Sequence, residues 1–105
     1  TGAAVGEWAV SALRGLSVDV AFMGTNGFSV ARGLTTPDQD EARAKQAMVE
    51  AARRVVVVSD ATKAGDDHLH RFADLDQVDL LITDTDLPDD VFAELHAAGP
   101  DVVRA

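Results

Sequence analysis

Residues 19–45 read DVAFMGTNGFSVARGLTTPDQDEARAK, and this stretch predicts a strand, two glycine steps and a helix in direct succession. The strand is an almost continuous apolar run at Val18–Met23, as expected of a strand covered on both faces. The chain then breaks at Gly24-Thr25-Asn26-Gly27 and again at Gly33-Leu34-Thr35-Thr36. In α/β proteins, small anionic ligands bind in loops at the carboxyl ends of strands and at helix N-termini. We therefore expect a ligand to bind in this stretch.

The helix after the second glycine step is predicted by its start signals. Thr36 is a candidate N-cap, Pro37 suits the first helical position, and Gln39 completes a capping box. Apolar residues between Ala42 and Ala52 form a slim stripe that extends the helix to about residue 54. Two arginines then fall in its last turn, where the helix dipole favours positive charge.

Outside this stretch, helical and extended patterns continue to alternate. Helices are predicted at residues 4–13 and 89–98, and strands at residues 55–58, 78–83 and 102–103. Residues 28–34 favour a short extended piece, and residues 67–75 leave a short helix and irregular structure both open. Strands that alternate with helices indicate an α/β, Rossmann-like three-layer domain with a mostly parallel sheet. Because the chain starts inside a helical pattern without a leading strand, we expect the domain to be N-terminally truncated.

Composition restricts the class of protein. The chain has 105 residues, which allows one modest domain with a hydrophobic core, and no cysteine for a disulfide or a thiolate metal site. Its 18 acidic and 9 basic residues give a net charge of −9, so this segment should repel nucleic acid and anionic lipid. No apolar run approaches the roughly 20 residues of a membrane span. We expect a soluble, cytoplasmic protein that does not bind a membrane.

The two glycine steps are candidate ligand cradles. Glycines let the backbone adopt positive φ and turn its N–H groups toward a ligand, and Thr25 and Asn26 add hydrogen-bonding side chains. A plain strand-ending turn explains the same residues equally well, because Asn-Gly favours turns. At the second step, the N–H groups and hydroxyls of Gly33, Thr35 and Thr36 could hold a phosphate or a carboxylate. The alternative is that Thr36 only caps its own helix.

Charged residues extend this candidate site. Glu41 and Lys45 are spaced for an ion pair on one helix face, and the alternative role for Glu41 is a ligand-binding carboxylate. Asp60 and Lys63 follow a buried strand, where they could grip a polyhydroxy phosphate from two sides. Asp84 occupies the equivalent position after the next long strand.

Other chemistry is weakly signalled. His68 and His70 lie beside two aspartates and superficially suggest a metal site, but the third histidine, His96, is on a separate helix. We therefore expect neither a metal nor a cofactor. The sequence also lacks the P-loop pattern and the G-x-S-x-G nucleophile elbow.

Four motifs occur in a fixed order that resembles a known family. They are D-x-A-F-x-G-T-N-G at residues 19–27, G-L-T-T-P-D-x-x-E-A-x-x-K at 33–45, V-V-V-S-D-A-T-K at 56–63 and D-x-L-I-T-D at 79–84. Together they resemble the C-terminal effector-sensing domain of the DeoR family of bacterial transcriptional repressors. The resemblance covers nearly the whole chain, from residue 2 to residue 105.

This resemblance implies a fold shared with ribose-5-phosphate isomerases, glucosamine-6-phosphate deaminases and coenzyme A transferases. It implies a homo-oligomeric sensor, without enzymatic activity, that binds a phosphorylated sugar or related metabolite and so relieves DNA binding by an attached helix-turn-helix domain. That DNA-binding domain and a first strand with its phosphate loop are absent from residues 1–105, which form a single partial domain. The residues implied in the ligand cleft are Asp19, Gly24, Thr25, Asn26, Gly27, Gly33, Thr35, Thr36, Glu41, Lys45, Asp60 and Lys63.

Two alternatives remain open. A sugar-phosphate isomerase or deaminase of the same fold would use Asp19 and Glu41 for acid–base chemistry and Lys63 near the phosphate, as the related isomerases imply. The second alternative is a phospho-acceptor receiver domain with Asp84 as the acceptor. It is disfavoured because Lys63 precedes the aspartate, whereas a receiver needs its lysine after a later strand.

Overall fold

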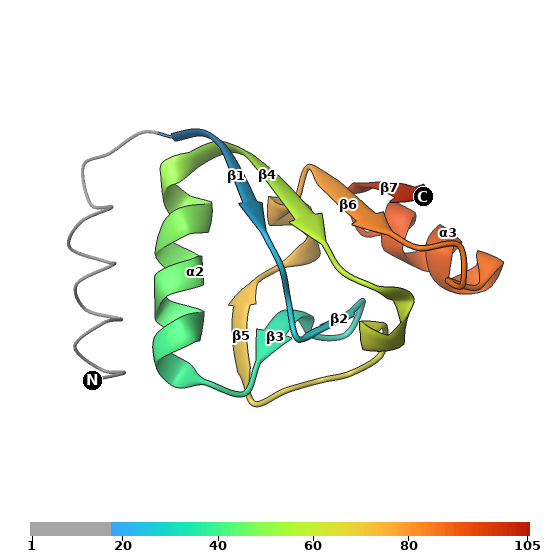
Figure 1. The fold of residues 1–105 in the computed structure, drawn as a ribbon, viewed down its shortest axis with the longest axis horizontal. Coiled ribbons are helices and arrows are strands. Elements are labelled where there is room, and N and C mark those ends of the chain that lie inside the picture. The colour runs from blue at the N-terminus through green and yellow to red at the C-terminus, as the bar shows by residue number, and fades with distance from the viewer. Residues whose placement is uncertain (1–17) are drawn as a thin grey trace.

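A computed structural model describes residues 18–105, and it contains two β-sheets and two α-helices (Figure 1). The helix predicted at residues 4–13 lies outside the described residues. The first sheet is parallel, in the order β1 (Val18–Met23), β4 (Ala52–Val58), β6 (Leu80–Thr83) and β7 (Asp101–Arg104). The second is antiparallel, in the order β2 (Gly27–Ser29), β3 (Gly33–Thr36) and β5 (His70–Ala73). The predicted α/β, Rossmann-like class with a mostly parallel sheet is confirmed.

Helix α2 (Gln39–Ala51) starts later and ends earlier than predicted. Its N-cap is Asp38, whose side chain accepts the N–H of Asp40 at 3.1 Å, and not Thr36. Thr36 is the last residue of β3, where its backbone pairs with β5. At the other end, the expected helical arginines belong to β4, since Arg54 pairs with Val20 of β1. Tertiary strand pairing therefore overrides the local helix signals at both ends.

The antiparallel sheet is the main element that the pattern did not predict. The short extended piece predicted at residues 28–34 is instead a hairpin of β2 and β3 that spans residues 27–36. His70–Ala73 add the third strand, in a segment for which the sequence leaves helix and irregular structure open. Phe28 and Leu34 form a cross-strand pair, and both side chains are fully buried. Strands this short carry too few residues for a readable alternation, so their pairing partners decide their conformation.

The remaining elements follow the predicted order. Asp89–Ala97 form α3, close to the predicted limits of 89–98, and β7 contains the predicted strand at residues 102–103. Two 3₁₀ turns follow strands, η1 at Ala61–Lys63 and η2 at Leu75–Gln77. Strand β6 begins at Leu80, two residues later than predicted, because Val78 caps η2 instead. Within residues 18–105, the helices are too short or too polar to cross a membrane.

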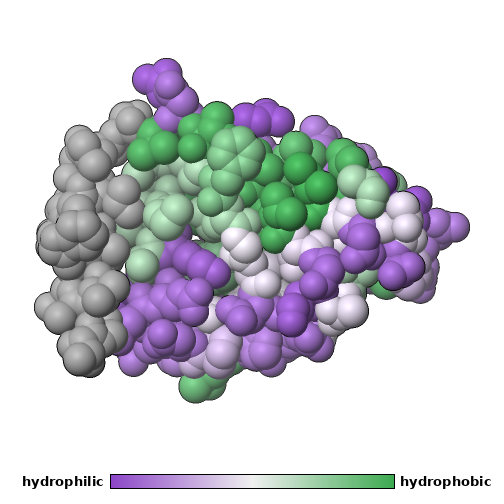
Figure 2. All heavy atoms as spheres, viewed as in Figure 1, coloured by the Kyte–Doolittle hydropathy of each residue, from purple (hydrophilic) through white to green (hydrophobic). Residues whose placement is uncertain are grey.

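The hydrophobic core lies on one face of the parallel sheet. Met23, Val57 and Leu81 point to this face and pack with α2, the antiparallel sheet and Leu95 of α3 in a single cluster. The alternate side chains of the same strands form an exposed apolar surface, visible as the green area over the sheet (Figure 2). Its most exposed members are Phe22 (69%), Val58 (52%), Val103 (46%) and Val20 (37%). Among the described residues, helices cover the sheet on the core face.

Candidate ligand site at the carboxyl ends of β1 and β4

Three segments meet where β1 and β4 end: the glycine loop (residues 24–27), strand β3 and the chain after β4. Met23 pairs with Val57 at the end of these parallel strands, so both following loops leave from the same edge. The chain after β4 then runs beside β2, where the Gly65 N–H donates to the Phe28 carbonyl at 2.8 Å. The structure thereby brings together the predicted site residues that follow β1 and β4.

The glycine loop is held by hydrogen bonds within the protein. The Thr25 hydroxyl donates to the Gly27 carbonyl at 2.7 Å and lies 3.2 Å from the Thr35 carbonyl. A Cβ at Gly27 would lie 2.0 Å from the Asp66 carbonyl oxygen, so glycine is required there for close backbone approach. The expected positive φ is absent at Gly24 and Gly27 and occurs at Gly33 (φ +73) instead. The loop therefore depends on tight packing rather than on a left-handed turn.

The second glycine step is strand β3 and not the start of a helix. Thr35 and Thr36 are both fully buried. The Thr35 hydroxyl accepts the His68 N–H at 3.0 Å, and the Thr36 hydroxyl lies 3.5 Å from the Glu41 carboxylate. Both hydroxyls thus contact groups within the protein, and these contacts hold together the segments that carry the candidate site.

The start of α2 is a poor site for an anion. Its N-cap carboxylate, Asp38, already accepts a helical N–H, and Asp40 and Glu41 lie in the first turn. Three negative side chains oppose the attraction that a helix N-terminus otherwise has for phosphate. A phosphate group would therefore bind elsewhere in the site.

Lys45 connects α2 to the glycine loop. Its ammonium group forms the predicted ion pair with Glu41 at 3.3 Å and donates to the Gly24 carbonyl at 2.9 Å. The same group lies 5.1 Å from the centre of the Phe72 ring. The Lys45 side chain is only 17% exposed, and these contacts connect the glycine loop to the helix.

The Asp60 loop (residues 59–65) contains the 3₁₀ turn η1 and two predicted site residues. Asp60 accepts a hydrogen bond from the Thr62 hydroxyl. Lys63 is half-buried, and none of the three ion pairs within residues 18–105 includes it. Among the described residues Lys63 thus differs from Lys45, whose ammonium group has protein partners.

Two residues depart from the expected composition of the site. Asp19 lies at the amino end of β1, roughly 13–17 Å along the strand from the glycine loop, and is not brought together with the others. The sequence suggests His68 only as a metal ligand, whereas in the structure its Nε2 lies 3.1 Å from the Asn26 carbonyl oxygen. No local signal reveals that contact, because it depends on the hairpin of β2 and β3. Within residues 18–105, no three His, Asp or Glu side chains group as metal ligands.

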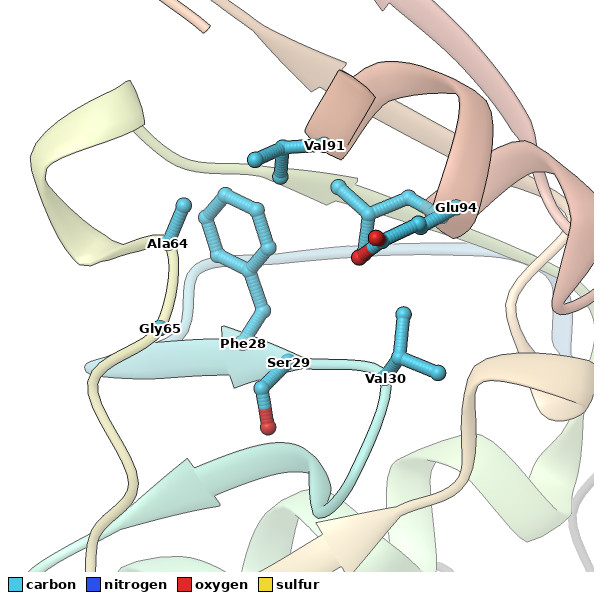
Figure 3. Close-up of a pocket in the computed structure, with 8 residues that line it drawn as sticks. Phe28, Ser29, Val30, Ala64, Gly65, Val91 and Glu94 are labelled. Atoms are coloured by element: carbon cyan, nitrogen blue, oxygen red, sulfur yellow. The ribbon is translucent and has the colours of Figure 1, made fainter. Parts of the chain in front are cut away.

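A separate cavity of about 180 Å³ lies between the β2 hairpin, the Asp60 loop and α3 (Figure 3). Its walls are mainly apolar, and Glu94 contributes a carboxylate; the lining residues are Phe28, Ser29, Val30, Ala64, Gly65, Val91, Glu94 and Leu95. None of the predicted ligand residues lines it. Apolar walls and a negative side chain disfavour a phosphate, so this cavity is not the predicted site.

Comparison with known proteins connects this geometry to a family. A model of the DeoR C terminal sensor domain matches residues 1–85. The HTH-type transcriptional regulator GlpR of Haloferax volcanii is 46% identical over 98% of this chain and 40% of its own length. A putative aga operon transcriptional repressor of Escherichia coli O157:H7 is 34% identical, over 93% of this chain and 36% of its own. The HTH-type transcriptional repressor GlcR of Bacillus subtilis is 32% identical, over 86% and 34% respectively.

The fold defines an α/β domain in which two polar loops leave the carboxyl ends of two adjacent parallel strands. This chain belongs to the DeoR C-terminal sensor domain family, as its four ordered motifs predicted. It spans 40% or less of the length of the three relatives named above, all of which are transcriptional regulators by name.

Proposed function

We propose that this chain is the effector-sensing part of a DeoR-type transcriptional repressor. We further propose that a phosphorylated sugar, or a related metabolite, binds between the glycine loop and the Asp60 loop. The observation that carries this proposal is Lys63, a half-buried residue of the Asp60 loop that has no ion-pair partner within residues 18–105. On a chain of net charge −9, a cation in a strand-end loop that has no acidic partner among the described residues favours an anionic ligand.

The site residues divide into two roles under this proposal. Asn26, Asp60 and Lys63 would contact the ligand, with the amide and carboxylate on sugar hydroxyls and the ammonium on the phosphate. Thr25, Thr35, Thr36, Glu41, Lys45 and the three glycines would hold the loops in place, because their polar groups or backbones already contact protein. Asp19 is left out of the site since it lies at the other end of β1.

An isomerase or deaminase activity is less well supported. The acid–base pair expected for it would combine Asp19 with Glu41, but Asp19 lies at the far end of its strand. Glu41 is ion-paired with Lys45, which further removes it from a role as a free base. We therefore propose that the chain senses its ligand without converting it.

The remaining partners follow from the charge and the family. Because this segment is acidic, DNA would be bound by a separate helix-turn-helix domain. The relatives GlpR and GlcR are named as HTH-type regulators. That the regulator is a homo-oligomer, and that it is cytoplasmic, stay predictions. Size-exclusion chromatography with light scattering would measure the oligomeric state.

The experiment that tests the proposal is calorimetric titration of the full-length regulator with sugar phosphates and with the matching unphosphorylated sugars. We expect at least one phosphorylated sugar to bind, and Lys63→Ala to weaken it at least tenfold. Arg43→Ala is the matched control, because it removes one positive charge from an exposed position of α2. Wild-type affinity in Lys63→Ala would contradict the assigned site, and turnover of the ligand by the regulator would contradict the sensor role.

A further inference from the structure

Asp84 connects the loops that follow two adjacent parallel strands. It comes directly after β6, which pairs with β4, and its side chain is half-buried. One carboxylate oxygen accepts the Ala61 N–H of the Asp60 loop at 3.0 Å. The other accepts the Asp86 N–H of its own loop, also at 3.0 Å. A single side chain thus fixes the backbone of both loops.

The hydrogen bond to Ala61 caps the turn η1 from outside. Ala61 is the first residue of η1, and the preceding Asp60 makes no side-chain capping bond; its carboxylate accepts the Thr62 hydroxyl. The free N–H at the start of a helical turn needs an acceptor, and a carboxylate is the strongest available side-chain acceptor. Asp84 therefore takes the place of the local cap, and the second Asp60 carboxylate oxygen accepts no hydrogen bond from residues 18–105.

We infer that Asp84 is a positioning residue of the ligand site, which holds Asp60 and Lys63 beside the glycine loop through its bond to Ala61. This inference rests on the proposed function, since it assigns Asp84 to the same site. Asp84 does not itself contact the ligand. Its bonds to backbone N–H groups, and the lack of an acidic cluster around it within residues 18–105, also separate it from a phospho-acceptor aspartate.

If Asp84 positions Lys63, its replacement should weaken phosphate binding, which is the opposite of the electrostatic effect of removing a negative charge. Removal of a carboxylate near an anion site reduces repulsion and should tighten phosphate binding. Loss of the η1 cap should weaken binding, because Lys63 is then held less firmly. Asp86→Ala is the matched control for charge, since Asp86 is exposed, lies two residues away, and accepts no hydrogen bond from residues 18–105 through its side chain.

The test measures the binding of inorganic phosphate to the full-length regulator by ³¹P NMR titration, below the unfolding temperature of each variant. We expect Asp84→Ala to weaken binding at least tenfold, Asp84→Asn to keep part of the affinity through its remaining acceptor, and Asp86→Ala to bind as well as wild type or better. Hydrogen exchange should accelerate at the Ala61 amide in both Asp84 variants. Should Asp84→Ala not fold, Asp84→Asn carries both readouts.

The outcomes distinguish this inference from the proposed function. In one outcome the wild type binds phosphate, Lys63→Ala loses this binding, and Asp84→Ala has the same affinity as Asp86→Ala. That result would show that the positioning role of Asp84 is wrong, while the site assignment would stand. A lowered melting temperature with unchanged affinity and unchanged exchange at Ala61 also overturns the positioning role. If the wild type does not bind phosphate, or Lys63→Ala binds it normally, the proposed site fails and this inference fails with it.

Discussion

The Lys45 ammonium donates a hydrogen bond to the Gly24 carbonyl oxygen at 2.9 Å, across 21 residues of sequence. This bond joins the middle of α2 to the loop at the carboxyl end of β1. The same ammonium is paired with Glu41 and lies over the Phe72 ring, so one side chain ties helix, loop and second sheet together. Lys45, a residue of the predicted phosphate site, therefore makes contacts that should stabilise the fold, and its substitution should lower stability.

Lys45→Met should destabilise the fold. It removes a hydrogen bond from a charged donor while it keeps most of the apolar stem, so we expect a loss of about 1–3 kcal/mol in the free energy of unfolding. Urea denaturation followed by circular dichroism measures it. Arg43→Met, on the exposed face of the same helix, should change stability by less than about 0.5 kcal/mol. Equal effects of the two substitutions would show that the Gly24 bond does not stabilise the protein.

Gly27→Ala should be destabilising and Gly24→Ala should not. The added Cβ at residue 27 would lie 2.0 Å from the Asp66 carbonyl oxygen, which is backbone and yields only if the chain after the Asp60 loop moves. We expect a cost of about 1–3 kcal/mol from this overpacking. At Gly24 the nearest atom to a new Cβ is 3.7 Å away, and φ is not positive, so the change should stay within about 1 kcal/mol. Thermal unfolding of both variants decides between them.

Two phenylalanines on opposite sides of the fold should differ sharply in their contribution to stability. Phe28 is fully buried in the core cluster, and Phe28→Ala should cost about 3–5 kcal/mol. Phe22 is 69% exposed on the open face of the parallel sheet, so Phe22→Ala should cost less than about 1 kcal/mol in this chain. Chemical denaturation of both variants checks the contrast. A large loss for Phe22→Ala would mean that the exposed face is covered in the protein that is measured.

Thr35→Val tests whether the hydrogen bond between the His68 N–H and the Thr35 hydroxyl stabilises the protein. Valine keeps the shape but removes the acceptor for the His68 N–H, which is then left unsatisfied, and we expect a loss of about 1–3 kcal/mol. Faster hydrogen exchange at the His68 amide is the direct readout. Thr85→Val, at an exposed loop position, serves as the control with little expected effect. Unchanged exchange at His68 in Thr35→Val would contradict the role of this hydroxyl.

The ligand site illustrates the limit of prediction from the sequence. The glycine loop and the Asp60 loop were recognised because each follows a strongly apolar strand, and the carboxyl ends of neighbouring parallel strands meet at one edge. The contacts of His68 and Asp84 were not foreseen, since each joins segments more than 20 residues apart. The burial of Thr35 and Thr36 was likewise missed, because hydroxyl residues before a helix signal look the same whether they face solvent or a second sheet.

The series of parallel strands, the helix at the C-terminal end and the family can all be predicted from the sequence, as the β-branched run at Val55–Val58 and the four ordered motifs illustrate. These features depend on local apolar patterning and on residue identity, both of which can be read along the chain. The antiparallel sheet, the ends of α2 and the contacts of Lys45 and Asp84 emerge only in the folded chain. Strand pairing and long-range hydrogen bonds depend on which distant groups come within about 3 Å of each other, and the local sequence pattern does not encode that distance.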